Sequence, residues 1–306
     1  MSGVGDPVSF MRRTFSLEFK KSGSEEWAGP CPWCAGTDRF HVWKRGNYMC
    51  RPGPGHCGKS GWLDELDGTK PSSEEQRLEW RVAALERQVK EHDERLSTLE
   101  RMAKCTDHLA YHRNLQANDQ ALDYWLGEGL YLQTIDRFNL GYCPSCPTYP
   151  PSPSFTIPVT YNGRLYNIRH RLQYPKAGSK YRPHMVGLPA MLFNADDLKA
   201  KDARRLLVVE GEKKAMIVSQ ETTLPVVGTM GKQSFKPEWA SKAQRFAEVV
   251  VCYDPDATEQ ATATATLFGR RGRVMILPMK ADDFFTLGGG GVDEFLYAVK
   301  VARPAA

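Results

Sequence analysis

Two strongly apolar runs in the last third of the chain each stop at acidic residues. One run occupies residues 206–209 (LLVV) and stops at Glu210; the other occupies 249–253 (VVVCY) and stops at Asp254 and Asp256. Continuous apolar runs are typical of strands buried on both faces, as in a parallel sheet. Because the carboxyl ends of parallel strands line one crevice, we expect these carboxylates to meet there. Such a group suits Mg²⁺, which takes oxygen ligands and substrate phosphates.

Strand and helix patterns alternate throughout residues 204–306. The spacing predicts further strands at 225–229 and 273–278, and helices at 212–220, 237–247, 258–268 and from 292 onward. This alternation predicts a parallel sheet covered by helices on both faces. The strand at 273–278 precedes Asp282 and Asp283, so we expect a third set of carboxylates at the same edge.

Residues 105–203 predict a mixed α+β region. Two short helices with a glycine turn are expected within 122–142, and Asn162-Gly163 between two alternating runs is a strong hairpin signal. No carboxylate occurs from Tyr161 to His184. The basic and tyrosine residues of this stretch are Arg164, Arg169, Arg171, Lys176, Lys180 and Arg182 with Tyr161, Tyr166, Tyr174 and Tyr181. Cations beside aromatic faces indicate nucleic-acid or nucleotide binding. A solvated basic hairpin is the alternative, and the neighbouring carboxylate edge favours binding.

A long charged helix is predicted over residues 71–104, with a capping signal at Pro71 and Ser72. Its apolar seam alternates steps of four and three residues: Leu78, Val82, Leu85, Val89, His92, Leu96 and Leu99. This heptad seam predicts either a spacer with a coiled-coil partner surface over 74–102, or a solvated helix packed against its own chain. About 30 helical residues would reach ~45 Å.

Four cysteines near the start of the chain have the spacing of a zinc site. Cys31 and Cys34 form a CxxC pair, and Cys50 and Cys57 follow across a predicted strand–turn–strand. This pattern predicts a zinc ribbon holding one structural Zn²⁺, with reduced cysteines as the alternative. The six residues between Cys50 and Cys57 make the second pair wide, so His56 is an alternative ligand to Cys57. His41 is a more remote candidate.

Two further motifs carry weaker signals. Residues 53–60 (GPGHCGKS) satisfy the P-loop pattern, which would indicate an ATPase, but the run contains a candidate zinc cysteine and precedes only a short segment. Cys143 and Cys146 form a second CxxC in a proline-rich loop, and we expect free thiols there. Cys105 and His108 could join them only if the fold brought them close.

Composition narrows the class of protein. The 306 residues carry a net charge of +5 and are 41% hydrophobic and 25% charged, which indicates a globular chain. No run approaches the roughly 20 apolar residues of a membrane span. The N-terminal residues do not resemble a signal peptide, so eight cysteines favour metal ligation or free thiols, and we expect a cytoplasmic protein, bacterial or in a phage-infected host.

The acidic motifs carry a family resemblance. Glu210 followed by the Asp254–Asp256 pair resembles the Toprim signature, shared by bacterial-type primases, topoisomerases, a recombination mediator and some nucleases. Residues 126–142 resemble the primase pattern YL-x-x-RGL…I-x-x-F-x-LGY, residues 155–171 its FPI…GR stretch, and residues 180–181 its KY element. With the upstream cysteines, the chain resembles bacterial and phage DNA primases.

That resemblance implies four regions and a set of site residues. The regions are a zinc-ribbon template-binding domain (1–70), a helical linker (71–104), an α+β subdomain of the primase core (105–203) and a Toprim catalytic domain (204–306). The implied ligands of Mg²⁺ or Mn²⁺ are Glu210, Asp254, Asp256 and one of Asp282 and Asp283. Glu210 would alternatively act as general base. The residues implied to bind template or nucleotide are Arg169, Arg171, Lys180, Tyr181, Arg182 and Lys213.

The chain departs from the family at several points. Glu128 stands where the primase pattern carries arginine, the second cysteine pair is wide, and the third acidic motif is shorter. No helicase domain follows the sheet in this sequence, so we expect a separate replicative helicase as partner. The resemblance implies a DNA-directed RNA polymerase, a nucleotidyltransferase that makes short primers from ribonucleoside triphosphates on single-stranded DNA. The alternatives are a non-catalytic DNA-binding recombination mediator and a Toprim nuclease.

Overall fold

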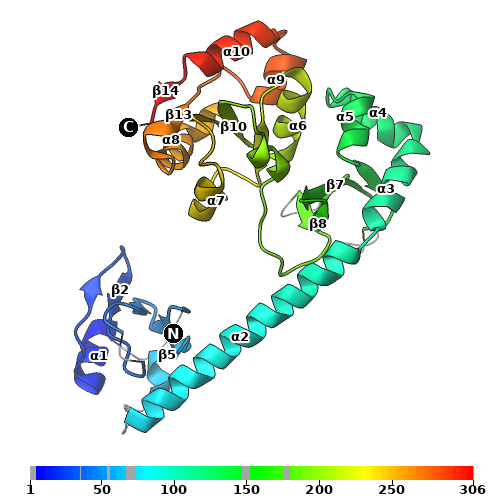
Figure 1. Ribbon diagram of the computed structural model, residues 1–306. Helices are drawn as coiled ribbons and strands as arrows, with labels where there is room; N and C mark the ends of the chain where they lie inside the picture. Colours follow the sequence, from blue (N-terminus) through cyan, green and yellow to red (C-terminus); the bar gives the residue numbers. More distant parts are fainter. Residues whose placement is uncertain are drawn as a thin grey trace. The chain divides into compact units, whose positions relative to one another are not determined.

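The computed structural model describes residues 5–34, 36–53, 56–66, 74–146, 152–175 and 180–305. The chain forms two compact units, Met1–Leu96 and Ser97–Ala306. The predicted helix start at Pro71 and Ser72 and the basic residue Lys176 lie outside the described residues. The expected fold class is confirmed: a small cysteine-containing module, a long helix, an α+β region and a largely parallel sheet with helices (Figure 1).

The first unit contains a five-stranded antiparallel sheet in chain order. Its elements are α1 (Pro7–Phe15), β1 (Lys20–Lys21), β2 (Glu26–Gly29), β3 (Phe40–Trp43), β4 (Asn47–Cys50), β5 (Ser60–Trp62) and the 3₁₀ helix η1 (Leu63–Glu65). Asp6 starts α1 by accepting a hydrogen bond from the Ser9 amide. Phe15, Trp33 and Phe40 pack together around the cysteines, so aromatic side chains form most of this small core.

The P-loop pattern does not form a P-loop. Within the described part of residues 53–60, the chain enters β5, which pairs with β4, and the short η1 follows. A phosphate-binding loop needs a substantial helix at this point to direct its amides and dipole at the phosphate. The ATPase interpretation is therefore wrong.

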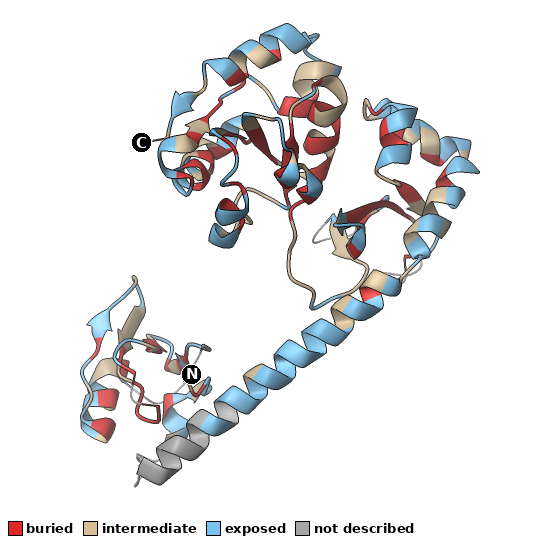
Figure 2. Ribbon diagram, in the orientation of Figure 1, coloured by how far each residue is buried: buried red, intermediate tan, exposed pale blue. Residues whose placement is uncertain are grey.

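Helix α2 (Glu74–Lys104) is 31 residues long, about 46 Å at 1.5 Å per residue. Described seam residues Val82, Leu85 and Val89 are 45–59% exposed (Figure 2). The apolar seam is therefore exposed to solvent along this stretch of α2. Near the end of the helix, Met102 is buried with Leu165 and Ile168 of the second unit, which fixes the last turn to the body of that unit.

Helices and an antiparallel sheet form the first half of the second unit. The elements are α3 (Asp107–Gln116), α4 (Asp119–Gly127), α5 (Leu132–Arg137), β6 (Gly141–Cys143), β7 (Ser154–Tyr161), β8 (Arg164–Leu172) and β9 (Tyr181–Pro183). The four strands pair in order. Asn162 and Gly163 both have positive φ, as a two-residue type I′ hairpin requires, so the Asn-Gly signal places this turn correctly.

A five-stranded sheet with order β11-β10-β12-β13-β14 forms the second half. Its elements are the 3₁₀ helices η2 (Ala195–Lys199), η3 (Pro255–Ala257) and η4 (Gly269–Arg271), the strands β10 (Arg205–Glu210), β11 (Val226–Thr229), β12 (Glu248–Cys252), β13 (Gly272–Val274) and β14 (Arg303–Pro304), and the helices α6 (Glu212–Glu221), α7 (Pro237–Lys242), α8 (Thr258–Thr266), α9 (Ala281–Thr286) and α10 (Val292–Lys300). The first four strands are parallel and β14 is an antiparallel edge.

Alternate residues of the central strands pack on opposite faces of this sheet. In β10, Leu207 and Val209 join the core that contains α6 and α10, whereas Leu206 and Val208 join the core that contains α7 and α8 (Figure 1). Side chains alternate along a strand, so a continuous apolar run is what a sheet covered on both faces requires.

Two expected elements differ from the structure. The strand expected at 273–278 ends at Val274, where its register with β12 ends at Val251. Asp282 and Asp283 therefore do not follow a strand end directly: they lie in the first turn of α9. The helix expected at 237–247 ends at Lys242. Among the described residues, no helix is both long enough and apolar enough to span a bilayer.

Candidate functional site

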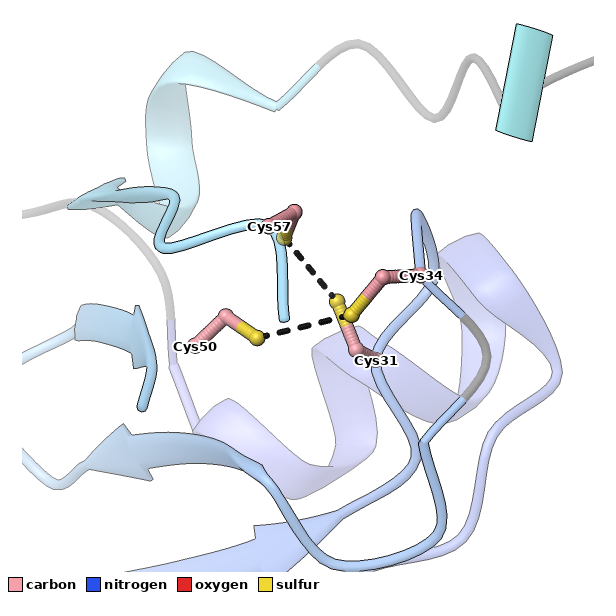
Figure 3. A group of neighbouring side chains, drawn as sticks. All are labelled: Cys31, Cys34, Cys50 and Cys57. Carbon is pink, nitrogen blue, oxygen red and sulfur yellow. Dashed lines mark hydrogen bonds between the residues drawn. The ribbon is translucent and has the colours of Figure 1, made fainter. Parts of the chain in front are cut away.

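Four buried thiols of the first unit point toward one another (Figure 3). The Sγ atoms of Cys31 and Cys57 are 3.6 Å apart, as are those of Cys34 and Cys50. Zinc–sulfur bonds of 2.3 Å in a tetrahedron place neighbouring sulfurs about 3.8 Å apart. The cysteine cluster therefore fits a structural zinc site.

Neither histidine candidate belongs to this group. His56 Nδ1 donates to the carbonyl oxygen of Arg51 at 2.5 Å, and His41 pairs through Nδ1 with Glu26. The fourth thiol in the group is that of Cys57. Hydrogen bonding with the Cys31 thiol lowers the pKa of Cys34 and lowers that of Cys50 to about 7, whereas the bonds shared within the cluster raise the pKa values of Cys31 and Cys57. Lowered pKa values favour the thiolate, which is the form that binds zinc.

In the second unit, the chain turns sharply from strand β10 into helix α6 at Gly211. Glu210 ends the strand, Gly211 has a φ of 93° and Glu212 begins the helix. The Gly211 amide donates to the Thr229 carbonyl at 2.9 Å, which fixes the turn against β11. Glycine suits this turn because positive φ is strained for other residues. The turn places both glutamates at the carboxyl edge of the sheet.

A cavity of about 300 Å³ opens at this edge. It brings together three acidic candidates, Glu210, Asp282 and Asp283, and five of the proposed binding residues, Arg169, Arg171, Lys180, Tyr181 and Lys213. The acidic side chains come from β10 and α9, and the others come from β8, β9, α6 and the segment before β9. Although α9 is a helix, it still delivers its acids to the carboxylate edge.

Asp254 and Asp256 follow β12 and lie beside the cavity, outside its lining. Lys214, which lines the cavity, places its Nζ 3.0 Å from Asp254 Oδ1. Lys232 Nζ lies 3.2 Å from Asp256 Oδ2, and that hydrogen bond lowers the pKa of Asp256. Asp254 and Asp256 are therefore each paired with a lysine.

The carboxylates of this edge are partly unsatisfied. Burial raises the pKa of Glu210, and the nearby Asp254 charge raises it further. Glu210 Oε2 and Asp282 Oδ1 are buried without a hydrogen-bond partner among the described residues. Buried polar atoms are rarely left unpaired, and a cation is one of the groups that satisfies them. The donor set of carboxylate oxygens fits a hard divalent ion.

Lys213 links the acidic and basic sides of the cavity. Its Nζ lies 2.8 Å from Asp282 Oδ2 and 2.7 Å from Glu128 Oε2. Burial opposes the charge on Lys213, but the hydrogen bonds that Lys213 donates to Asp282 and Glu128 outweigh this effect, and the pKa of Lys213 is raised. Burial likewise opposes the charge on Asp282, yet Lys213 holds the pKa of Asp282 below its ordinary value.

Two arginines of β8 face the cavity because they are two residues apart on one strand. Arg169 pairs with Glu212 and lies over the Tyr181 ring, 4.6 Å from its centroid. Arg171 pairs with Glu128 at 3.4 Å. Ion pairs and rings hold both guanidinium groups in place.

Arg182 occupies a different position from the other proposed binding residues. It lines a second, more apolar cavity of about 320 Å³, which shares Arg169, Tyr181 and Met230 with the first. The two cavities are therefore adjacent, with these three residues between them.

Sequence reasoning missed several residues of the cavity. Glu128, Glu212, Lys214 and Lys280 line it but were absent from the proposed site. Glu212 and Lys214 follow Glu210 directly, so the turn into α6 could have indicated them. Glu128 has no local signal, because its partner Lys213 is 85 residues away.

The second CxxC pair does not form a metal cluster with other described residues. Cys143 and Cys146 are buried and form no disulfide, and Cys143 Sγ lies 3.1 Å from the Ser145 carbonyl oxygen. Cys105 lies instead near Asp107 and His184.

Comparisons with known proteins agree with this architecture. No family model matches the chain. A DNA primase of Geobacillus stearothermophilus is 26% identical over 227 residues, covering 60% of this chain and 38% of that protein. The match thus spans well under half of the relative's length.

Solved structures extend the comparison to the fold. The zinc-binding and RNA polymerase domains of the Aquifex aeolicus primase match 98% of this chain and 86% of that one, with a TM-score of 0.56 and 16% identity. A DnaG primase catalytic domain bound to single-stranded DNA matches 70% of this chain and 84% of that one, with a TM-score of 0.55 and 20% identity.

The RNA polymerase domain of the Mycobacterium tuberculosis primase matches 68% of this chain and 81% of that one, with a TM-score of 0.56 and 17% identity. At these identities the structural matches establish the fold, and the sequence match points to the same family. The resemblance to primases of the bacterial type is therefore confirmed, and the chain has the fold of their zinc-binding and RNA polymerase domains.

Proposed function

We propose that this chain is a DNA primase, a DNA-directed RNA polymerase that joins ribonucleotides into short primers on single-stranded DNA. The observation that carries the proposal is the cavity in which Glu210, Asp282 and Asp283 face Arg169, Arg171 and Lys180. The carboxylates would hold metal ions, and the cations would bind phosphates. Nucleotidyl transfer requires both, because charge on the triphosphate must be neutralised while the reacting atoms are aligned.

The reaction would form one bond and break another at the α-phosphorus. The primer 3′-oxygen attacks the α-phosphate of the incoming nucleotide, pyrophosphate leaves, and the hydroxyl proton passes to a base. Glu210 would serve as that base as an alternative to binding the metal, and its raised pKa supports this role because a more basic carboxylate accepts a proton more readily. Lys180, Arg171 and Arg169 would bind the triphosphate or template, with Tyr181 holding Arg169 in place.

Glu210, Asp254, Asp256 and one of Asp282 and Asp283 would hold Mg²⁺ or Mn²⁺. When bound, these ions neutralise the triphosphate and polarise its phosphorus centre. Asp282 is the better candidate of its pair because it is buried and its Oδ1 lacks a hydrogen-bond partner among the described residues. Lys214 and Lys232 would give up their contacts with Asp254 and Asp256 when cations bind there.

The other regions would serve the same reaction. The cysteine module would hold Zn²⁺ and bind template, and a separate replicative helicase would deliver single-stranded DNA in the cytoplasm. The seam of α2 over 74–102 would contact a coiled-coil partner. Support for that surface is the exposure of Val82, Leu85 and Val89; the side chains of 74–81, 83 and 84 lie outside the described residues.

Incubation with single-stranded DNA, labelled ribonucleotides and Mg²⁺ or Mn²⁺ tests the proposal. A primase yields short RNA products that depend on template. A cut template would indicate a nuclease, and retarded DNA without products would indicate a binding protein such as a recombination mediator. Either of these two outcomes would overturn the proposal.

Alanine at both Asp254 and Asp256 is expected to abolish primer synthesis while the fold persists. Two of the proposed metal-binding carboxylates are lost. The exposed Asp256–Lys232 pair is worth only about 0–1 kcal/mol, whereas the Asp254–Lys214 pair, with both side chains 14% exposed, is the part of the change whose effect on the fold must be checked. Product yield and circular dichroism of the same preparation provide the measurements. The matched control is Asp123→Asn on the exposed face of α4, which should leave synthesis unchanged. Full activity in the double variant would exclude this metal site.

A further inference from the structure

A second group of metal-ligating side chains lies in the unit Ser97–Ala306, outside the catalytic cavity. Cys105, Asp107 and His184 each offer one ligand atom, and these atoms lie within 4.8 Å of one another. His184 Nε2 is 3.9 Å from Cys105 Sγ and 3.3 Å from Asp107 Oδ2. Ligands of a tetrahedral zinc ion are separated by roughly 3.3–3.8 Å, so small side-chain movements would complete the site.

Backbone structure holds the three residues in place. Cys105 lies in the break between α2 and α3, where its amide donates to the Met102 carbonyl at 3.0 Å, and Asp107 begins α3. His184 follows β9, and its amide donates to the Ile168 carbonyl at 2.8 Å. A ligand shared by these residues would join the α2–α3 corner to the edge of the antiparallel sheet.

A buried relay orients the His184 ring. His184 Nδ1 lies 3.1 Å from His170 Nε2, and His170 Nδ1 lies 2.8 Å from Ser154 Oγ. Both His170 and Ser154 are fully buried. If His170 donates to Ser154 and accepts from His184 Nδ1–H, the lone pair of His184 Nε2 points at Cys105 and Asp107. Metal-bound histidines commonly use their second nitrogen in this way.

The walls of the group are apolar and aromatic. The Tyr111 ring packs edge-on against both histidine rings, at centroid distances of 5.7 Å from His170 and 6.1 Å from His184. The buried cluster of Met102, Leu165 and Ile168 lies against Cys105 and Tyr111. Asp107, in contrast, is at the surface, so the group is dry on one side and reaches solvent on the other.

We propose that Cys105, Asp107 and His184 bind a second zinc ion, with water as the fourth ligand. Thiolate, imidazole and carboxylate together favour zinc over Mg²⁺, which prefers oxygen ligands. The water would bind on the solvent-exposed side of the group, next to Asp107. Binding of the ion would fix the end of α2 to the sheet that carries Arg169 and Arg171. It does not depend on the proposed polymerase activity.

Zinc content of the whole chain tests the proposal. After dialysis against micromolar Zn²⁺ and removal of free ion, elemental analysis should find two zinc ions per chain. Cys105→Ser and Asp107→Asn should each leave one. A Cys31→Ser/Cys34→Ser variant should also leave one, because it loses the cluster in the first unit. His108→Gln, on the same helix as Asp107 but outside the group, is the matched control and should keep two.

Cobalt provides an independent readout of the same ligands. In the Cys31→Ser/Cys34→Ser background, added Co²⁺ should give a thiolate-to-cobalt charge-transfer band, and adding Cys105→Ser should abolish it. Because Asp107 is exposed, Asp107→Asn tests the site without risk to the core, with circular dichroism checking the fold. One zinc ion in the wild-type chain, or two in Cys105→Ser, would overturn the proposal.

Discussion

Glu128, like Glu212, is an acidic residue paired with the basic side chains of the cavity. It sits at the end of α4 and pairs with Arg171 at 3.4 Å and with Lys213 at 2.7 Å. In the primase pattern that the chain resembles, arginine stands at this position. The substitution reverses a charge and uses two cations that would otherwise be available to phosphates. Glu128 therefore lowers the positive charge that this cavity offers to a nucleotide.

Replacing Glu128 with glutamine should tighten binding of a non-hydrolysable ribonucleoside triphosphate by roughly fivefold at low salt. In the wild-type chain, Glu128 competes with phosphate for Arg171 and Lys213. Removing about 1 kcal/mol of this attraction, at ion pairs that are partly exposed, gives that factor. Calorimetric titration at two salt concentrations provides the measurement, and the gain should shrink as salt screens the charges. Asp123→Asn on the same helix is the control. Weaker binding in the Glu128 variant would show that the carboxylate positions Lys213 instead of competing with phosphate.

The raised pKa of Glu210 has a consequence for metal binding. Because burial and the Asp254 charge favour the protonated form, Glu210 stays partly protonated at pH values above the ordinary glutamate value of about 4.3. A metal ion binds the deprotonated form, so Mn²⁺ affinity should fall as the pH is lowered from neutral, beginning above that value. Electron paramagnetic resonance of free Mn²⁺ between about pH 5 and pH 8 measures this.

Glutamine at position 210 should weaken Mn²⁺ binding at neutral pH and flatten its dependence on pH. The remaining carboxylates, Asp254, Asp256 and one of Asp282 and Asp283, would still contribute, and the lowered pKa of Asp256 keeps it charged throughout this range. An unchanged pH profile in Glu210→Gln would assign the titration to another group.

At the scale of elements, the small sheet of the first unit depends on its cysteine cluster. Cys31, Cys34, Cys50 and Cys57 belong to the same buried cluster as Phe40 and Trp33, so the metal would replace much of an apolar core. Structural zinc sites contribute about 10–16 kcal/mol in small domains. Without zinc, the charged thiolates would repel one another inside this core.

Removal of that zinc should therefore unfold the first unit selectively. Chelation, or the Cys31→Ser/Cys34→Ser variant, should abolish the near-ultraviolet dichroism of Trp33 and red-shift its fluorescence, while the melting transition of the second unit persists. Zinc added back to the chelated protein should restore both signals, and Cys143→Ser in the second unit is the matched control. Native signals in the zinc-free protein would contradict a folding role for the metal.

The elements with a strong local pattern could be predicted from sequence, and those fixed by distant partners could not. The strand before Glu210 and the turn at Asn162-Gly163 could be predicted because their signals are local. The strand is a continuous apolar run, and the turn has residues that adopt positive φ. The strand at 273–278 was predicted too long, because its end depends on its pairing with β12. Asp282 lies in helix α9 but still lines the cavity, where it pairs with Lys213. That contact depends on the packing of α9 against α6.

The same division applies to the sites. Cysteine spacing alone indicates the metal cluster of the first unit, because all four thiols lie within 27 residues. The group formed by Cys105, Asp107 and His184 joins residues up to 79 apart, and no spacing rule brings them together. Glu128 is similar: its role follows from its contact with Lys213 and Arg171, and the sequence shows only that it departs from the family pattern.

At the scale of the molecule, the two units have separate cores. The buried cluster around the cysteines lies wholly within Met1–Leu96, and the clusters around the two sheets and Met102 lie within Ser97–Ala306. Among the residues that the structure describes, neither unit contributes a side chain to the cores of the other. The cavity lined by Glu210 and Asp282 also consists of residues from the second unit alone.

A fragment of residues 97–306 should accordingly fold alone and keep the Mn²⁺ and nucleotide affinity of the whole chain. It should lose template-dependent initiation, because the proposed template contacts of the cysteine module are absent. Extension of a preformed RNA primer on the same template should survive, since this step bypasses initiation. Comparing both reactions for fragment and whole chain separates the two roles. Equal initiation by the fragment would exclude a template role for the cysteine module, whereas an unfolded fragment would show that the two cores depend on each other.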